Sequence, residues 1–350
     1  MEPIKEYYFD CAASAPVLPC AVENMKYPYA NPNSVHSRGR DARADLEIAR
    51  TKIAECIGAE PNEIYFSPSA TAACRSACEL LVIGDCSPHE HKAVKDACLN
   101  VQRNFIFFPW GEPATVAHIL ASNETGEIFI DEVKELVTSG KTVFTDATAA
   151  MGHIPINVKK LGVAALAAGG HKFGAPPGIG FLYVKDGVAH IGNADRDFTF
   201  PGTPPVALAC AMADALKYRT RRMKEANAYM LSERSVLIDH LLTIPGAHIN
   251  CADKPCLPNI LSVRFDGINA RELLTLMDVN GLCASAGSAC HAEDDKPSAA
   301  LLAAGLSEVE ARSTIRLSWC EETSEADFVS CWLIIRDCVE RLRTLGGIPT

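Results

Sequence analysis

Lys172 is the residue of this sequence whose setting most suggests chemistry. It follows a run of small apolar residues at 164–169, lies in the stretch Gly170-His-Lys-Phe-Gly, and precedes a second apolar run at 178–184. This pattern predicts a strand, a glycine-rich turn and another strand, with the lysine on a tight connection between buried elements. Lysine side chains avoid such places unless they are paired or used covalently. A surface lysine beside a structural turn is the alternative that this stretch leaves open.

Asp146 and Thr71 stand at points where a parallel α/β sheet places its functional groups. Residues 142–146 predict a strand that ends at Asp146, and the carboxyl ends of such strands carry the site. Residues 63–67 predict a strand and residues 72–82 a helix, and the helix start between them favours an anion such as phosphate, to which Thr71 can add a hydroxyl. For both residues, capping of the following segment is the competing explanation.

Cys290 differs from the other cysteines. It lies in a stretch rich in Gly, Ser and Ala at 281–292, which has no large residue to pack, so we expect an exposed and reactive thiol. The chain has 15 cysteines and none are spaced as Cys-x-x-Cys, so the spacing indicates neither a zinc nor an iron–sulfur site. Most lie in apolar helical contexts and are expected to be small core residues, as at Cys74, Cys78, Cys210, Cys331 and Cys338.

Two histidines, His89 and His91, precede a predicted helix. A metal site at this pair lacks a third ligand at a suitable spacing, whereas an imidazole at a helix start can stack on a flat ligand. A polar loop at 29–39, rich in Asn, Ser and His, is of the kind that shapes a pocket, although ordinary turn chemistry explains it as well.

The predicted elements form two domains. Strand and helix patterns alternate from about residue 60 to 185, which predicts a mostly parallel sheet covered by helices. A helix is predicted at 40–56, and a longer one at 205–242 carries a basic cluster, expected to be a solvated face, at Lys217, Arg219, Arg221 and Arg222. Strands at 259–265 and 314–319 and helices at 271–280 and 327–345 follow. We expect a large domain of residues 14–245 and a small α/β domain of residues 1–13 and 246–350.

Composition narrows the class of protein. The chain has 350 residues, a net charge of −10 and 48% hydrophobic residues, which is typical of a globular protein and argues against nucleic acid or an anionic membrane as the main partner. No apolar run reaches membrane-spanning length, and residues 1–10 lack the basic start and apolar core of a signal peptide. A cytoplasmic location is therefore expected.

Taken together, the motifs resemble those of the group I cysteine desulfurases. This NifS/IscS type belongs to the class V aminotransferases, which are pyridoxal 5'-phosphate (PLP) enzymes of fold type I. The resemblance extends over nearly the whole chain, with motifs in the family's order at Asn31-Pro-Asn-Ser-Val-His, Glu90-His-Lys-Ala-Val, Ser122-Asn-Glu-Thr-Gly, Thr145-Asp-Ala, Gly170-His-Lys, Gly287-Ser-Ala-Cys and Ser313-Thr-Ile-Arg-Leu-Ser.

The resemblance implies PLP as the cofactor and assigns residues to it. Lys172 would bond covalently to the PLP aldehyde, and Asp146 would pair with the pyridinium nitrogen and keep it protonated. His91 would stack on the ring, as a third catalytic residue beside Lys172 and Cys290, and Asn123 would hydrogen-bond the phenolic oxygen. The phosphate contacts implied are Ala70, Thr71, His171 and, reaching the partner subunit's cofactor in a homodimer, Thr203.

The same resemblance implies the substrate contacts and the reaction. Arg316 would bind the carboxylate of L-cysteine bidentately, with Asn31 as a further substrate contact. Cys290 would attack the substrate sulfur, so that a persulfide forms on the enzyme and L-alanine is released. The sulfur would pass to an acceptor protein, for example in iron–sulfur cluster assembly. A selenocysteine lyase and a degenerate PLP-fold protein with a binding role are the alternatives.

The chain departs from the family's pattern near the expected cofactor. Ala149 and Gly169 stand where the family usually has Gln and Ser, and Phe200 or Pro201 stands where it has Arg. Residues 72–75 also replace a run that is usually polar. Each hydrogen bond lost to a charged phosphate would weaken PLP retention by about 1.5–3 kcal/mol.

Overall fold

A computed structural model describes residues 5–27, 29–104, 114–188, 202–286 and 296–346. The chain divides into two compact units. The larger unit comprises Pro16–Ala121 and Phe129–Met223, and the smaller unit comprises Met1–Ala15, Ser122–Ile128 and Lys224–Thr350. Among the described residues, no helix has the length and apolar character needed to cross a membrane.

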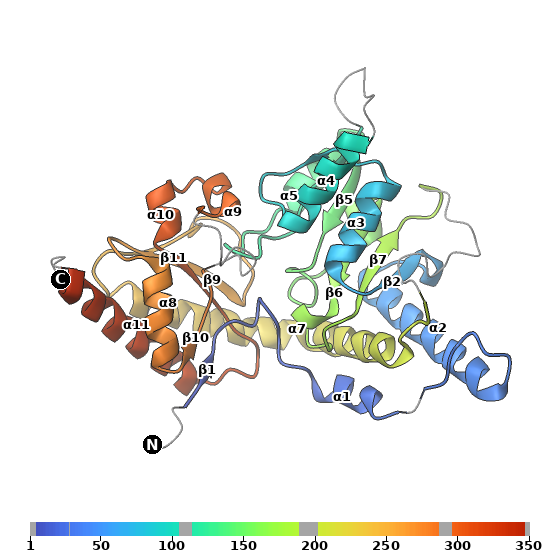
Figure 1. The fold of residues 1–350 in the computed structure, drawn as a ribbon, viewed down its shortest axis with the longest axis horizontal. Helices are drawn as coiled ribbons and strands as arrows, with labels where there is room; N and C mark the ends of the chain where they lie inside the picture. Colours follow the sequence, from blue (N-terminus) through green and yellow to red (C-terminus); the bar gives the residue numbers. More distant parts are fainter. Residues whose placement is uncertain (1–4, 28, 105–113, 189–201, 287–295, 347–350) are drawn as a thin grey trace. The chain divides into compact units, whose positions relative to one another are not determined.

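The larger unit is built on a six-stranded sheet of order β2-β7-β6-β5-β4-β3 (Figure 1). Strands β3 to β6 are mutually parallel, whereas β7 runs antiparallel to both of its neighbours, which confirms the mostly parallel sheet. The strands are β2 (Ile64–Ser67), β3 (Asp85–Cys86), β4 (Thr115–Ala117), β5 (Thr142–Asp146), β6 (Ala165–Gly169) and β7 (Gly180–Val184).

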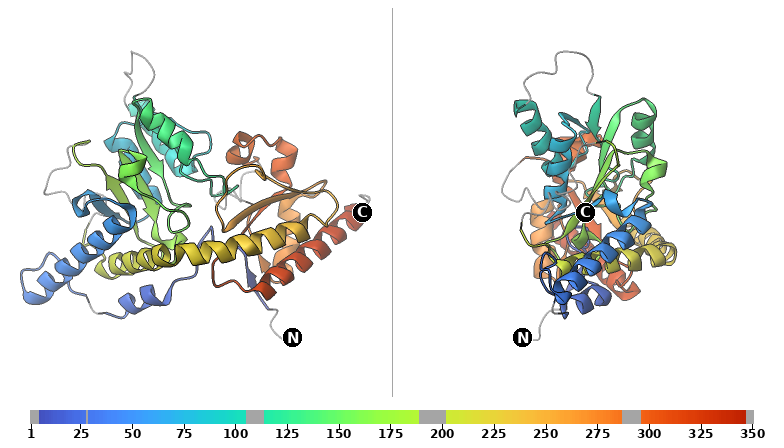
Figure 2. Two further views of the ribbon diagram at one scale, coloured as in Figure 1. Left: turned by 180° about the vertical axis from the view of Figure 1, so that it is seen from behind. Right: turned by 90° about the vertical axis from the view of Figure 1, so that its right-hand side faces the viewer.

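Helices cover both faces of this sheet. Figures 1 and 2 show α3 and α4 together on one face and α5 on the other. The residues of α3 and α4 that face the sheet are mostly Ala, Cys and Val, and they form one buried cluster with Phe144 and Leu182. Small side chains let the helices approach the strands closely. The helices of this unit are α1 (Pro19–Met25), α2 (Ser37–Ile57), α3 (Ala70–Leu80), α4 (Lys92–Asn104), α5 (Ile130–Thr138), α6 (Val158–Leu161) and the 3-10 turns η1 (Pro61–Glu63) and η2 (Gly170–Lys172).

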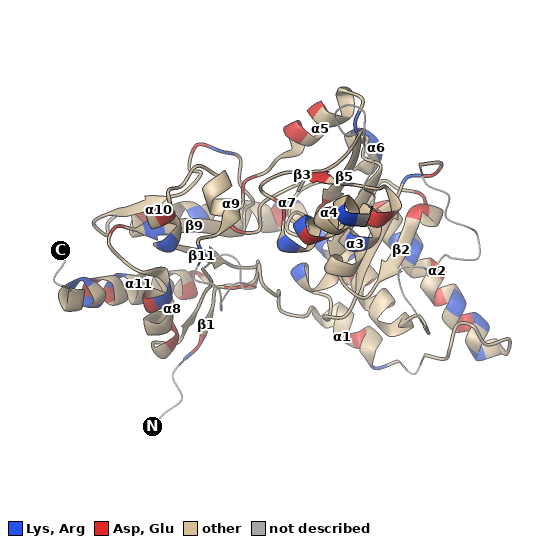
Figure 3. Ribbon diagram, turned by 45° about the horizontal axis from the view of Figure 1, so that its top comes forward, with Lys and Arg blue, Asp and Glu red and all other residues tan. Residues whose placement is uncertain are grey.

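Helix α7 (Val206–Leu241) begins in the larger unit and ends in the smaller one. Its basic cluster is not one solvated face, as the sequence pattern suggested, because Arg219 is only 5% exposed. Arg219 packs against Gly152, where an added Cβ would lie 3.3 Å from the arginine Cβ. Figure 3 shows basic and acidic residues interspersed along the other long helices, α2 and α11 (Glu325–Gly346).

The smaller unit contains a three-stranded antiparallel sheet of order β11-β9-β8 and a parallel pair of β1 and β10. Strand β11 contains Arg316, which the sequence predicted as a substrate contact. The elements are β1 (Tyr7–Tyr8), β8 (Ala247–Ile249), β9 (Ile260–Phe265), β10 (Leu282–Cys283), β11 (Thr314–Ser318), α8 (Ala270–Val279), α9 (Ala299–Ala303) and α10 (Glu308–Arg312).

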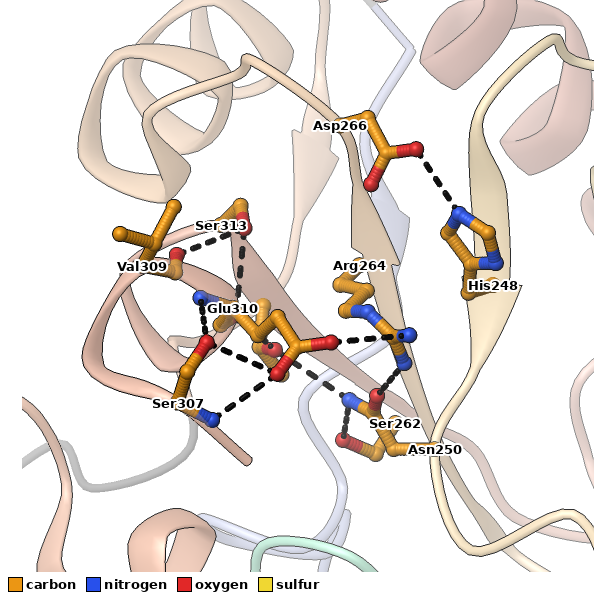
Figure 4. A network of polar contacts seen from close by, with 10 residues as sticks. His248, Asn250, Ser262, Arg264, Asp266, Ser307, Val309, Glu310 and Ser313 are labelled. Carbon is orange, nitrogen blue, oxygen red and sulfur yellow. Dashed lines mark hydrogen bonds and ion pairs between the residues drawn. The ribbon is translucent and has the colours of Figure 1, made fainter. Parts of the chain in front are cut away.

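A polar network holds α10 to the sheet of the smaller unit (Figure 4). Arg264 of β9 pairs with Glu310 of α10 at 3.1 Å, and its Nη1 donates to Asn250 at 2.8 Å. Asn250 in turn donates to the hydroxyl of Thr314, the first residue of β11, at 3.2 Å. Because β11 follows α10 directly, these contacts fix the entry of the strand that contains Arg316.

Three aromatic rings form the centre of the smaller unit's core. Phe9, Trp319 and Phe328 are 0%, 0% and 3% exposed, and Phe328 meets each of the other two rings edge-on at 5.3 Å. Edge-to-face pairs of this kind add to the stabilisation that burial provides. Phe9 precedes the first turn and Trp319 follows β11, so the cluster joins both ends of the chain.

We predict that Phe328→Ala lowers the free energy of unfolding of the smaller unit by about 3–5 kcal/mol, because it leaves a cavity between two rings. The neighbouring change Val329→Ala is the matched control, since Val329 is 45% exposed and its truncation should change stability by less than about 0.5 kcal/mol. Urea unfolding followed by tryptophan fluorescence measures both. Equal effects of the two changes would contradict this account of the core.

Candidate active site

Lys172 lies on the turn that the sequence predicted. Strand β6 ends at Gly169, the turn η2 follows, and β7 returns antiparallel from Gly180. The turn is fixed by Gly170, whose N–H donates to Ile179 O and whose carbonyl accepts from Ala175 N, both at 3.0 Å. Lys172 itself is half-buried. Its amine therefore lies at the end of the sheet on a rigid connection.

Asp146 is the last residue of β5, the strand beside β6, and is 5% exposed. Its Oδ1 accepts the Thr148 N–H at 2.9 Å, so Asp146 caps the following segment as the alternative predicted, but residues 148–151 form a turn and not a helix. No Lys, Arg or His of the described residues forms an ion pair with this carboxylate. A buried carboxylate of this kind suits a cationic ligand group, because burial of an unpaired charge is unfavourable.

Glu90 is a second buried acid in the larger unit, which the sequence reasoning quoted only as part of a motif. It is 2% exposed, and neither carboxyl oxygen has a hydrogen-bond partner among the described residues. Burial, together with the Asp146 carboxylate, raises the pKa of Glu90 well above its usual range. Burial and the same aspartate also raise the pKa of the Cys74 thiol.

The start of α3 forms a cradle of small residues. Ser69 caps the helix by accepting the Ala72 N–H at 3.1 Å, so the alternative that Thr71 is the cap is wrong. A Cβ on Gly180 would lie 2.7 Å from Ala168 O and 3.0 Å from the Ser69 carbonyl carbon, so only glycine lets the strand pass this close to the helix start. Thr71, in the first turn, is exposed. The end of an 11-residue helix, with a hydroxyl beside it, suits a phosphate.

Gly169 has a packing reason for its departure from the family's pattern. A Cβ there would lie 3.1 Å from the Ala70 Cβ and 3.3 Å from a carbon of the His171 ring. A serine at this position would crowd both. Gly169 therefore lets β6 lie close to Ala70 and to the His171 ring.

The imidazoles of the larger unit have distinct settings. His171 is half-buried, and burial, with the nearby charge of Lys172, lowers its pKa to about 4, so it is neutral at pH 7. The Nδ1 of His91 accepts the Ala93 N–H at 3.1 Å at the start of α4, while His89 packs on Phe129 with ring centroids 4.7 Å apart. Among the described residues, no group of three or more His, Cys, Asp or Glu could hold a metal ion.

In the smaller unit, Arg316 and Asn123 come together. Arg316 is 2% exposed, its Nη1 donates to the backbone carbonyl of Asn123 at 2.8 Å, and its Nη2 pairs with Asp10 Oδ1 at 2.6 Å. Asp10 was not selected from the sequence. The signal that was available is an acidic residue just after a short predicted strand, a feature similar to the one that singled out Asp146.

The remaining predicted residues lie in exposed positions or outside the described residues. Asn31 is exposed, and its Oδ1 accepts the Asn33 N–H at 2.9 Å, as turn chemistry predicts. Thr203 is exposed, and Ala149 is half-buried. Cys290 lies outside the described residues, as do Phe200 and Pro201. The structural cysteines are confirmed as buried at positions 74, 78, 210, 331 and 338.

Comparison with known proteins identifies the family. The class-V aminotransferase family matches residues 7–91 and 111–329. The chain belongs to this family. It is 31% identical to the cysteine desulfurase IscS of Methanosarcina thermophila, over 98% of this chain and 94% of that one, and 32% identical to an IscS-like cysteine desulfurase of Mycobacterium tuberculosis, over 96% and 97%.

Solved structures give the same result for the fold. A NifS-like protein superposes with a TM-score of 0.85 at 27% identity, covering 96% of this chain and all of the other. A structure described as SspA in complex with cysteine superposes with a TM-score of 0.73 at 26% identity, covering 91% and 100%. The fold is therefore that of NifS-like PLP enzymes of fold type I, as the sequence predicted. The class-V aminotransferase family uses PLP.

The described residues fit that cofactor. A cationic ring nitrogen would balance the buried Asp146 carboxylate, and the start of α3 can hold a phosphate. Lys172 lies at the same end of the sheet, after the strand that pairs with β5. These are the three points at which PLP makes its strongest contacts with a protein.

His153 of the larger unit is buried, and the charge that acts on it is that of Arg219. Burial first, then the charge of Arg219, lowers the pKa of His153 to about 4, and a contact with the Lys172 backbone acts weakly in the other direction. The folded protein therefore keeps this imidazole neutral at pH values at which the unfolded chain, with a pKa near 6.5, is protonated. The stability that the neutral imidazole contributes is therefore present above the pKa of the unfolded chain and is lost as the pH falls toward 4.

We predict that between pH 7 and pH 4 this imidazole alone lowers the free energy of unfolding by roughly 3 kcal/mol. His153→Gln should make the pH dependence shallower by that amount in urea titrations across this range. The control Val236→Ala alters an exposed side chain that does not titrate and should leave the slope unchanged. A wild-type slope in His153→Gln would show that His153 is not buried in its neutral form.

Proposed function

We propose that the protein is a PLP-dependent cysteine desulfurase, which converts L-cysteine to L-alanine and transfers the sulfur to Cys290. The observation that carries the proposal is the buried Asp146 carboxylate without a cationic partner, on the strand beside the one that leads to Lys172. A cofactor with a protonated ring nitrogen and an aldehyde complements this pair. The similarity to IscS proteins over nearly the whole chain supports the same activity.

The larger unit would hold the cofactor. Lys172 would bind it covalently through Nζ, and Asp146 would keep the proton on the ring nitrogen. His91, oriented by the N–H of Ala93, would stack on the ring. When bound, PLP supplies an electron sink for the carbon skeleton of the substrate.

The phosphate would lie at the start of α3. Thr71 would donate its hydroxyl, the N–H of Ala70 would point into the same region of the helix start, and His171, neutral at pH 7, would donate a ring N–H. In a homodimer, Thr203 of the partner subunit would add a further contact; its exposure in the single chain is consistent with that role.

Three further residues are proposed for substrate and cofactor. Arg316 would take the substrate carboxylate, Asn123 would hydrogen-bond the cofactor's phenolic oxygen, and Asn31 would contact the substrate. Cys290, as thiolate, would attack the substrate sulfur. A sulfur–sulfur bond forms, the carbon–sulfur bond breaks with its electron pair left on carbon, and the carbon takes up a proton to give alanine.

The destination of the sulfur and the setting of the protein follow from that reaction. The persulfide on Cys290 would be handed to a sulfur-acceptor protein, for example in iron–sulfur cluster assembly. The proposed setting is the cytoplasm, a reducing compartment in which the Cys290 thiol would stay reduced between turnovers. Domains of residues 14–245 and of 1–13 with 246–350 remain the proposed division into a cofactor domain and a domain with the cysteine loop.

We predict that the purified protein takes up PLP with visible absorbance and releases alanine from L-cysteine. Lys172→Ala should abolish the wild-type absorbance band. Cys290→Ala should keep that band and lower alanine release at least 100-fold, because the attacking sulfur is missing. The matched control is Cys283→Ala, which removes a half-buried thiol whose pKa is raised to about 11 by burial and by Glu6.

Three outcomes would contradict the proposal. A protein that does not take up PLP would be a degenerate member of the fold. Alanine release at the wild-type rate by Cys290→Ala would show that another thiol receives the sulfur. Turnover of selenocysteine without turnover of cysteine would identify a selenocysteine lyase, which uses the same types of residue.

A further inference from the structure

The proposed function assigns no role to the ion pair between Asp10 and Arg316. Arg316 is 2% exposed and Asp10 is 22% exposed, and the Nη2–Oδ1 distance is 2.6 Å. The pair is therefore well shielded on the arginine side and partly accessible on the aspartate side. Among the ion pairs of the described residues, those at the surface contribute little, whereas a buried arginine requires a partner.

The guanidinium is held at two different nitrogens. Nη2 donates to the Asp10 carboxylate and Nη1 donates to the Asn123 carbonyl at 2.8 Å. Two contacts at opposite nitrogens fix both the position and the plane of this planar group. A guanidinium has five N–H donors in one plane, and a carboxylate accepts two of them in parallel. Orientation of the plane therefore decides whether a substrate carboxylate can be bound bidentately.

Asp10 is itself fixed to the strand of Arg316. The backbone of Asp10 bridges to Ser318, with Ser318 N donating to Phe9 O at 2.8 Å and Cys11 N donating to Ser318 O at 3.2 Å. The Ser318 hydroxyl also accepts the Ala12 N–H at 2.9 Å. These bonds lie two residues from Arg316 along β11, so the carboxylate and the guanidinium are placed by the same short stretch of paired backbone.

On the other side, Arg316 is paired with Ser285. Arg316 N donates to Ser285 O at 2.6 Å and Ser285 N donates to Arg316 O at 3.2 Å. The backbone of Arg316 is thus enclosed between β9 and Ser285, and freedom remains only in its side chain. Asp10 and Asn123 remove that freedom.

We propose that Asp10 is a positioning residue, which orders the Arg316 guanidinium in advance for the carboxylate of an amino-acid substrate. This inference rests on the proposed function, in which Arg316 takes the substrate carboxylate. Asp10 acts through Arg316 and does not touch the reacting atoms. Pre-ordering lowers the entropy that binding must remove, so its loss appears in KM and leaves the bond-breaking step unchanged.

The test compares wild type with Asp10→Ala and Asp10→Asn in the PLP-loaded enzyme. Asp10→Ala should raise KM for L-cysteine at least 10-fold and change kcat less than 2-fold. Asp10→Asn should lie between the two, because its side-chain carbonyl still accepts one bond from Nη2. Asp266→Ala is the matched control, since it removes an exposed aspartate of the same unit that pairs only with His248, and KM should stay at the wild-type value.

Two further measurements separate positioning from a general structural effect. Binding of L-alanine, followed by the absorbance of the bound cofactor, should weaken in Asp10→Ala as KM does, whereas ethylamine, which lacks the carboxylate, should bind as to wild type. In the background of Arg316→Ala, the additional change Asp10→Ala should alter KM less than 2-fold. The double variant lacks both members of the ion pair, so no buried arginine is left without a partner. It can therefore be measured even where Asp10→Ala alone does not fold.

The outcomes are distinguishable from those of the proposed function. A wild-type protein that does not turn over cysteine overturns both. Three results, each with normal wild-type turnover, overturn the positioning role alone. An unchanged KM in Asp10→Ala would mean that Arg316 is ordered without Asp10, and a lower KM in Asp10→Asn would mean that the aspartate repels the substrate. Equal weakening of L-alanine and ethylamine binding would mean that Asp10 serves only the fold.

Discussion

The pairing of β6 with β7 is the constraint on which the candidate site depends. The two strands are fully buried and pair over five residues, from Ala165 with Val184 to Gly169 with Gly180. The pair of glycines stands where the hairpin opens, and the start of α3 lies over it at a distance that any side chain on Gly180 would prevent. One short hairpin thus sets the position of Lys172 and of the helix start proposed to hold the phosphate.

Charge is handled differently in the two units. In the larger unit, Asp146 is buried without a cationic side-chain partner among the described residues, and it contributes to raising the pKa of the nearby Glu90 carboxyl. In the smaller unit, Arg316 is equally buried but already has Asp10. A carboxylate without a partner creates a demand for a cationic ligand, whereas a paired arginine is pre-ordered and must share its donors. The unpaired carboxylate suits a tightly bound cofactor, whereas the paired arginine suits a substrate that binds and dissociates in each turnover.

One departure of this chain from its family's pattern, Gly169, has a local packing reason. At Gly169 a larger residue would crowd Ala70 and the His171 ring, and these are two of the groups proposed to contact the phosphate. Glycine at this position thus leaves room for Ala70 and the His171 ring close to the strand. The chain keeps Lys172, Asp146 and His91, the residues proposed to bind the cofactor beside this position.

The sequence by itself determined the order and type of the elements and the residues at strand ends, because hydrophobic period and turn residues are local properties. It predicted β5 ending at Asp146, the turn at Lys172 and the long helix α7. It missed the cap of α3, where Ser69 and Thr71 are chemically equivalent candidates and only the backbone geometry selects one. Only the tertiary structure showed that Arg219 is buried against Gly152 and that the Asp146 carboxylate acts on Glu90. It also showed that Asp10 pairs with Arg316, 306 residues away in the sequence. Contacts of that kind are set by chain topology, on which local pattern carries no information.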